Sequence, residues 1–190
     1  MLTVYRRRSD MTWIQTYTGK RFSLLEPKAA DVDIKDIAHA LAHLCRFTGH
    51  SKWFYSVAQH SVLASLEVRP EFARAALLHD AAEAYIGDVS APLKYAMAEV
   101  YGDGDHPYAQ IEDRIAAVVS NAFGLNPEML HHPAVRQADL RMLMTERRDL
   151  MHTAKLGWNI SAEPYPTVIV PWSAYKAEQE FLARLQALKH

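Results

Sequence analysis

The sequence predicts a mostly α-helical protein, a helical bundle with a small β-hairpin near its N-terminus. Apolar residues recur at helical spacing along most of the chain, and several prolines stand where such runs begin. β-branched and aromatic residues instead surround one Thr-Gly pair close to the N-terminus. The length of 190 residues, with 49% hydrophobic and 23% charged residues, fits a single globular domain over residues 1–190.

The hairpin is expected over residues 12–26, with the Thr18-Gly19 pair in its turn. A helical core is expected over residues 33–151. The apolar spacing divides this core into helices at about 33–45, 57–68, 70–85, from Pro92 onward, 108–123 and 133–151. A last helix over residues 173–188 begins with Ser173 as a candidate N-cap, and residues 167–170 form a possible further strand before Pro171.

The charge and cysteine content exclude several classes of protein. With 21 basic and 22 acidic residues, the chain has a net charge of −1 and lacks the broad basic surface that binds duplex nucleic acid. Its single cysteine, Cys45, excludes an internal disulfide and fits a reducing compartment.

The beginning of the chain shows no secretory signal, and no apolar stretch approaches the roughly 18 residues of a membrane helix. We therefore expect a cytoplasmic protein with no membrane partner. Residues 1–11 are expected to be flexible, and Met11 is a possible natural start.

The segment of residues 77–85, LLHDAAEAY, carries the clearest sign of chemistry. On a continuous helix His79 and Glu83 share a face, and Asp80 reaches the same cavity. The apolar neighbours would bury this helix, and burying an ionised carboxylate without partners costs several kcal/mol or more. A divalent metal would offset that cost by taking imidazole nitrogen and carboxylate oxygen as ligands. A hydrogen-bonded His–Asp pair without a metal is the alternative.

Two other predicted helices add residues of the same kind. His60 stands early in a helix within the segment SVAQHS, and Asp139 lies inside an apolar helix within VRQAD. Three separate helices are thus expected to direct metal-type ligands toward the interior.

The order of these residues, H…HD…D, resembles that of the HD-domain metal-dependent phosphohydrolases. The sequence is most similar to the bacterial 5′-deoxynucleotidase branch, in the segments SVAQHS (56–61), HDAAEAYIGDVSAPLK (79–94) and VRQAD (135–139). The resemblance covers about residues 38–150. It implies an HD-domain helical bundle, a homodimer, and a small nucleotide as substrate.

The resemblance implies that His60, His79, Asp80 and Asp139 bind one divalent ion. Two imidazoles with two carboxylates suit Mn, Fe, Co, Ni or Zn better than Mg or Ca, which prefer oxygen ligands alone. Such an ion can lower the pKa of a bound water from 15.7 to about 7 and so prepare it for attack on phosphorus.

Five further residues are candidates for catalysis and substrate binding. Glu83 is a candidate for proton transfer or water positioning, as at the matching position of the resembling enzymes, and a surface carboxylate is its alternative. The resemblance implies that Asp88 lies near the attacking water and the sugar, and an ordinary loop acid is its alternative. Arg46 would clamp the phosphate through its planar guanidinium, with Phe47 near the base or sugar. Lys94 is a second phosphate candidate, and a solvated lysine is its alternative.

His39 and His43 stand four residues apart on the first predicted helix, which is a possible two-ligand pair. Their neighbours in the sequence supply no obvious acid. We therefore interpret His39 as a packed histidine and His43 as a surface histidine.

The leading hypothesis is hydrolysis of deoxynucleoside 5′-monophosphates to deoxynucleosides and phosphate. One alternative is a deoxynucleoside triphosphate triphosphohydrolase, because the same four ligands serve both reactions. The other is a catalytically silent HD-fold binding protein, which would be expected to have a broken ligand set.

Overall fold

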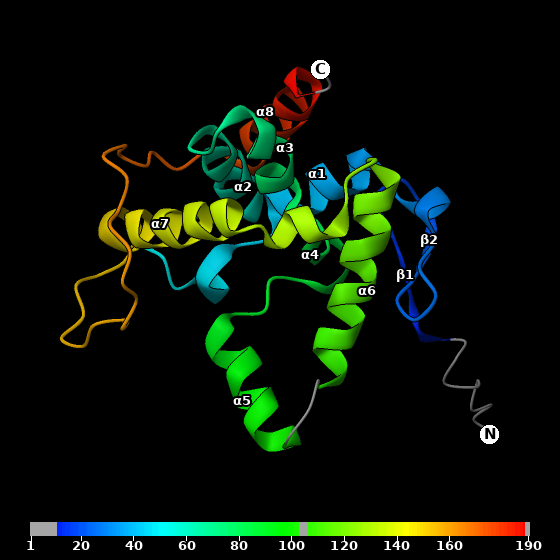
Figure 1. Cartoon of the computed structure of the whole chain (residues 1–190), viewed down its shortest axis with the longest axis horizontal. Coiled ribbons are helices and arrows are strands. Elements are labelled where there is room, and N and C mark those ends of the chain that lie inside the picture. Colours follow the sequence, from blue (N-terminus) through cyan, green and yellow to red (C-terminus); the bar gives the residue numbers. More distant parts are fainter. Residues whose placement is uncertain (1–10, 103–105, 189–190) are drawn as a thin grey trace, which may run out of the picture.

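The structure is a computed structural model that describes residues 11–102 and 106–188. It confirms the predicted class, a mostly α-helical protein with a small antiparallel hairpin near the N-terminus (Figure 1). The predictions made for residues 1–10, including flexibility and the choice of start, lie outside the described residues.

The hairpin consists of β1 (Trp13–Gln15) and β2 (Arg21–Ser23), within the predicted range. Its turn is anchored to the first helix, because both the backbone N–H and the hydroxyl of Thr18 donate to the buried carboxylate of Asp36, at 2.6 and 3.0 Å. Its buried face carries Phe22, whose ring stacks on Tyr85 at 3.7 Å between centroids. The hairpin is therefore fixed to the helical core by both polar and apolar contacts.

The helices begin and end close to their predicted boundaries, with one exception. Prolines occupy the first turn of several helices, where the missing N–H costs nothing, and Ser56 and Ser173 cap two others by accepting hydrogen bonds from backbone N–H groups. The helices are α1 (Ile34–His43), α2 (Val57–Leu66), α3 (Pro70–Leu78), α4 (Glu83–Ile86), α5 (Ala91–Tyr101), α6 (Pro107–Ala122), α7 (Pro133–Leu150) and α8 (Ala174–Ala187).

The continuous helix predicted over residues 70–85 is wrong. Helix α3 ends at Leu78, and a turn leads to the short α4. Within this turn the N–H of Ala81 donates to the carbonyl of Leu78 and that of Glu83 to Asp80, both at 3.0 Å, so each bond spans three residues instead of four. The apolar pattern continues through the turn because Ala81 is still buried, which is why the sequence pattern conceals the break.

The possible strand over residues 167–170 is also wrong. Its backbone is satisfied by side chains instead of a neighbouring strand: the Gln59 amide donates to the carbonyl of Val170 at 2.8 Å, and the N–H of Ile169 donates to Asp149 at 2.9 Å. Ile169 is buried, so a β-branched sequence here packs a connecting segment onto the helices without forming a sheet.

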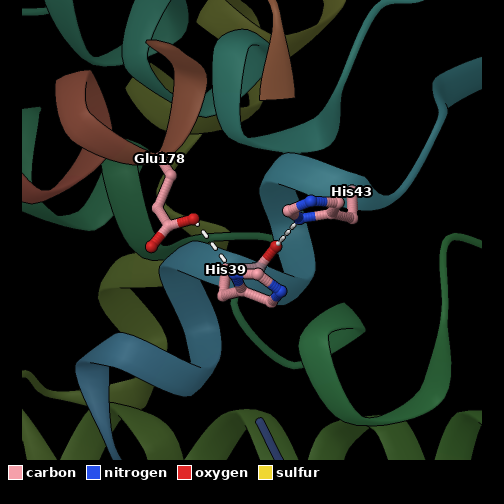
Figure 2. Close-up of side chains that lie close together, drawn as sticks. All are labelled: His39, His43 and Glu178. Atoms are coloured by element: carbon pink, nitrogen blue, oxygen red, sulfur yellow. Dashed lines mark hydrogen bonds and ion pairs between the residues drawn. The ribbon is translucent and has the colours of Figure 1, made fainter. Parts of the chain in front are cut away.

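Helix α8 returns to the beginning of the domain and packs on α1 and α2 (Figure 1). Ala177 and Phe181 of α8 are fully buried in this contact. Next to them Glu178 points at His39 of α1, with 3.0 Å between its Oε2 and the ring Nδ1 (Figure 2). Residues 139 positions apart in the sequence are thereby neighbours.

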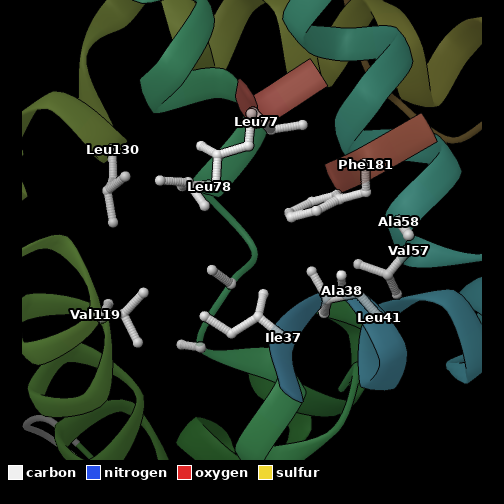
Figure 3. Close-up of a cluster of buried hydrophobic side chains, with 14 of the residues drawn as sticks. Ile37, Ala38, Leu41, Val57, Ala58, Leu77, Leu78, Val119, Leu130 and Phe181 are labelled. Atoms are coloured by element: carbon white, nitrogen blue, oxygen red, sulfur yellow. The ribbon is translucent and has the colours of Figure 1, made fainter. Parts of the chain in front are cut away.

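The main hydrophobic core joins α1, α2, α3, α6 and α8 (Figure 3). Ile37, Leu41, Leu77 and Phe181 are each fully buried within it. Burial of one such side chain contributes about 1.5–3 kcal/mol relative to exposure. This core holds α2 and α3 against α7. The site described next lies where His60 of α2, the turn after α3 and Asp139 of α7 meet.

Within the described ranges, none of the helices combines the length and the apolar character needed to cross a bilayer.

Candidate metal centre

Four predicted ligands meet between α2, α7 and the turn after α3. His60 of α2 is fully buried, and its Nε2 lies 3.3 Å from Nε2 of His79 and 3.2 Å from Oδ1 of Asp139. Asp80 Oδ2 lies 3.6 Å from Nε2 of His60 and 3.2 Å from Nε2 of His79. Atoms that bind one ion at about 2.1 Å lie about 3–4 Å apart. The ligand atoms of His60, His79 and Asp139 lie within 4.8 Å of one another and form a group that could hold an ion, whereas Asp80 lies beside this group and is not a member of it.

The hydrogen bonds of the two imidazole rings favour a cation between them. Nδ1 of His60 lies 2.6 Å from the carboxylate of Glu146, and Nδ1 of His79 lies 2.8 Å from the carbonyl oxygen of Ala76. Both partners can only accept, so in the neutral rings Nδ1 carries the hydrogen and Nε2 carries a lone pair. Two imidazole lone pairs and the carboxylate of Asp139 therefore lie close together, and a metal ion between them would satisfy all three.

The electrostatic surroundings also attract positive charge to this point. Burial and the nearby Arg46 act to lower the pKa of His60, but Glu146 and Asp139 outweigh them and raise it to about 9. Burial would raise the pKa of Asp139, yet its hydrogen bond to His60 and the charges around it hold that pKa below its usual range.

Glu146 is a buried residue in contact with the cluster that the sequence motifs did not reveal. Its side chain is completely buried and accepts a hydrogen bond from Nε of Arg46 at 3.2 Å, while its other oxygen holds His60. Burial acts to raise the pKa of Glu146, but Arg46 and His60 lower it overall. Glu146 follows Asp139 by seven residues on α7, two helical turns, so its place on the same face was a signal in the sequence.

Arg46 and Phe47 lie at the start of a strained turn. Phe47 and Thr48 have φ values of +56° and +52°, a left-handed conformation that costs about 1–3 kcal/mol for a residue other than glycine. Arg46 is nearly buried, and its Nη1 lies 3.6 Å from Oδ2 of Asp80. The ring of Phe47 instead packs toward Trp158, at 5.9 Å between centroids, and does not line the cavity beside the ligands.

Glu83 stands buried beside the ligands, at the start of α4. Its Oε2 makes no hydrogen bond within the described part of the chain. Burial, followed by the negative charges of Asp80 and Asp88, raises the pKa of Glu83 well above its ordinary value. This carboxyl group can therefore keep a proton at a pH where an exposed glutamate has lost it.

Asp88 follows Gly87, whose φ of +82° ends α4 and turns the chain. Burial and the neighbouring Asp80 raise the pKa of Asp88, while Arg46 opposes the shift. The turn thus places a second acid within electrostatic reach of the ligand cluster.

A cavity of about 330 Å³ opens beside the ligands. His79, Asp80 and Asp139 form part of its wall, together with Glu83 and Lys94. The remaining lining residues are Ala82, Glu112, Asp113, Ala116, Leu130, His131, Val135 and Arg136. The ligand cluster is therefore accessible to a small molecule.

Lys94 is held at the cavity wall by Glu112 of α6, at 2.7 Å between Nζ and Oε1. Burial acts to lower the pKa of Lys94, but the hydrogen bond to Glu112 raises it overall. The ring of Tyr108 lies 5.6 Å from the same ammonium, and its buried hydroxyl makes no hydrogen bond within the described residues. Tyr108 is a second residue at the site that no sequence motif singled out.

The fold and the site define a helical protein in which His60, His79 and Asp139 form a group that could hold a metal ion. No family model matches the chain. The chain is 46% identical over 140 residues to YfdR, an uncharacterized protein of Escherichia coli K12, with 74% of this chain and 73% of the relative covered. It is also 38% identical over 139 residues to an uncharacterized protein of Rhodobacter capsulatus, with 67% of each chain covered. The chain belongs to the same family as YfdR.

Proposed function

We propose that this chain is a metal-dependent phosphohydrolase of the HD-domain type that acts on nucleotides, and that deoxynucleoside 5′-monophosphates are its substrates. The observation that supports the proposal is the group of His60, His79 and Asp139, which could hold a metal ion, beside a cavity whose lining includes His79, Asp80, Asp139, Glu83 and Lys94. The resemblance of residues 79–94 to the 5′-deoxynucleotidase branch supports the choice of substrate.

His60, His79, Asp80 and Asp139 would bind a divalent transition metal. Mn, Fe, Co, Ni and Zn accept mixed nitrogen and oxygen ligands, and all suit this set. When bound, the ion supplies an acidified water and neutralises charge on the phosphate.

In this proposal Arg46 and Lys94, two basic side chains near the cluster, bind the substrate phosphate. Nη1 of Arg46 is directed at the cluster edge near Asp80, while Nε and Nη2 are held by Glu146. Lys94 lies at the cavity wall, with Glu112 keeping it in position. Charge-assisted hydrogen bonds of this kind stabilise the negative charge that develops on the phosphoryl oxygens.

In this proposal Glu83 transfers a proton. Because its pKa is raised, it can donate that proton to the leaving 5′-oxygen or hold water near the phosphorus. The negative charge of Asp88 raises the proton affinity of Glu83.

The test is product analysis with the metal-loaded protein. Purified chain would be incubated with Mn²⁺ or Co²⁺ and panels of ribo- and deoxynucleoside mono- and triphosphates, and the products identified by mass. Formation of deoxynucleoside and inorganic phosphate from monophosphates supports the proposal. Release of tripolyphosphate from triphosphates would assign the alternative hydrolase activity, and absence of turnover on every substrate despite bound metal would refute hydrolysis.

A further inference from the structure

A second group of metal-type ligands lies where α8 packs on α1. It consists of His39 and His43 of α1 and Glu178 of α8 (Figure 2). One ligand atom from each of these residues lies within 4.8 Å of the others. We propose that this group is a second divalent-metal site, for an ion of the zinc, nickel or copper type, which joins the C-terminal helix to the first helix.

No obvious acid stands near His39 and His43 in the sequence, but the tertiary structure brings Glu178 next to His39. Oε2 of Glu178 lies 3.0 Å from Nδ1 of His39, although 139 positions separate the two residues. The sequence predicted a packed His39 and a surface His43. In the structure His39 is half-buried and His43 is exposed, which agrees with that prediction. It missed their proximity to a carboxylate.

The two histidines are arranged as a pair. Four residues apart on α1, they have ring centroids 4.2 Å apart. Nδ1 of His43 lies 2.8 Å from the carbonyl oxygen of His39, which can only accept a hydrogen bond. In neutral His43 this leaves the Nε2 lone pair available to a metal.

The three side chains extend from rigid positions. Ala38 and Ala42, which directly precede the two histidines, are fully buried, as is Ala177 beside Glu178. The ring of His39 is further held by Tyr17, which stacks on it with 3.6 Å between centroids and 8° between planes. Because these positions are already ordered, metal binding would cost little further conformational entropy.

The donor set selects the class of ion. Two imidazoles and one carboxylate are a common zinc ligand set that leaves a position for water, whereas Ca²⁺ and Mg²⁺ prefer oxygen ligands alone. The side chains of His39 and Glu178 are 29% and 18% exposed, so an ion could enter from solvent yet be partly shielded from it. The group shares no residue with the His60 cluster.

The experiment counts the zinc ions bound by the full-length chain and measures their affinity, by equilibrium dialysis with elemental analysis and by calorimetry. The variants are His43→Asn, which changes an exposed side chain, and Glu178→Gln, which keeps the shape of the acid. His152→Asn, at an exposed histidine outside the group, is the matched control.

We expect both test variants to lose one class of bound zinc, with an affinity loss of at least about 10-fold at that site, and the control to bind like the unmodified chain. Zinc is also expected to raise the unfolding temperature of the control more than that of His43→Asn. Equal zinc binding by His43→Asn, Glu178→Gln and the unmodified chain would overturn the proposal and leave a His39–Glu178 hydrogen bond. The Asp139→Asn variant separates the two centres, because it removes a ligand of the His60 cluster alone.

Discussion

Glu146 holds Nδ1 of His60 through one carboxylate oxygen, at 2.6 Å, and both side chains are completely buried. The second oxygen of Glu146 is bound by Arg46 at 3.2 Å. A candidate metal ligand, an orienting carboxylate and an arginine directed at the cluster edge therefore form one continuous network. The orientation of the His60 ring depends on a residue from another helix.

Replacing Glu146 by Gln should weaken both folding and metal binding. The change removes the closer of the two carboxylates that face Arg46 and leaves only Asp80, at 3.6 Å. Breaking a buried charge pair costs up to about 3–5 kcal/mol. The change also removes the carboxylate that orients His60, for which about 10–100-fold weaker metal binding is expected. Urea unfolding and metal titration would measure the two effects, with the exposed Glu180→Gln as control. Unchanged stability and affinity would show that the network contributes neither effect.

Asp139→Asn should bind one metal ion fewer and lose phosphohydrolase activity while remaining folded. Asp139 is only half-buried, and an amide keeps its shape but removes the negative charge that favours a cation. Elemental analysis would measure the metal content, circular dichroism the fold, and a phosphate-release assay the activity. Asp31→Asn, which changes another half-buried aspartate, is the control. Full metal content in Asp139→Asn would remove this residue from the ligand set.

Glu83→Gln should leave the fold and the metal in place but lower kcat by about 10²–10⁴, the usual contribution of general acid–base catalysis. The pKa of Glu83 is raised in the folded chain, so the carboxyl group opposes folding as the pH rises above its unfolded pKa. The amide removes this opposition, and stability at neutral pH should therefore equal or exceed that of the unmodified chain. A kcat within a factor of about two of normal would contradict the proton-transfer role.

Removal of metal should abolish activity without unfolding the chain. The main core consists of apolar residues from several helices and needs no ion to form. After chelation and dialysis, the far-ultraviolet circular dichroism should keep its helical form, and added Mn²⁺ or Co²⁺ should restore phosphate release. Activity that survives complete demetallation would exclude the proposed mechanism.

Gln59→Leu should destabilise the chain, because Gln59 binds a segment that lies 111 residues further along the sequence. The Gln59 side chain donates to the carbonyl of Val170 and accepts from the N–H of Trp172, both at 2.8 Å. Leucine would remove both hydrogen bonds, each of which contributes about 0.5–1.5 kcal/mol to stability. Urea unfolding would compare it with the exposed Gln186→Leu, and equal midpoints would show that the C-terminal segment is held by other contacts.

Local patterns in the sequence were sufficient for most elements of the fold. The spacing of apolar residues in α1, α6 and α7 reports burial on one face. Prolines mark helix starts because the first turn needs no N–H donor there, and Ser56 and Ser173 mark them by accepting a hydrogen bond from the N–H three residues later. These patterns come from hydrogen bonds and burial within a single helix, so a short stretch of sequence is enough to contain them. The break after Leu78 could not be predicted in this way, because a change from four-residue to three-residue hydrogen bonds leaves the apolar periodicity almost unaltered.

The sequence by itself determined the helical class, the hairpin, and the identity of His60, His79, Asp80 and Asp139 as candidate ligands. Only the tertiary structure decided that Glu146 orients His60 and that Glu178 reaches His39. Those pairs are 86 and 139 residues apart, and their meeting depends on how whole helices pack. Packing of this kind sums many weak apolar contacts over the entire core, so no short stretch of sequence records it.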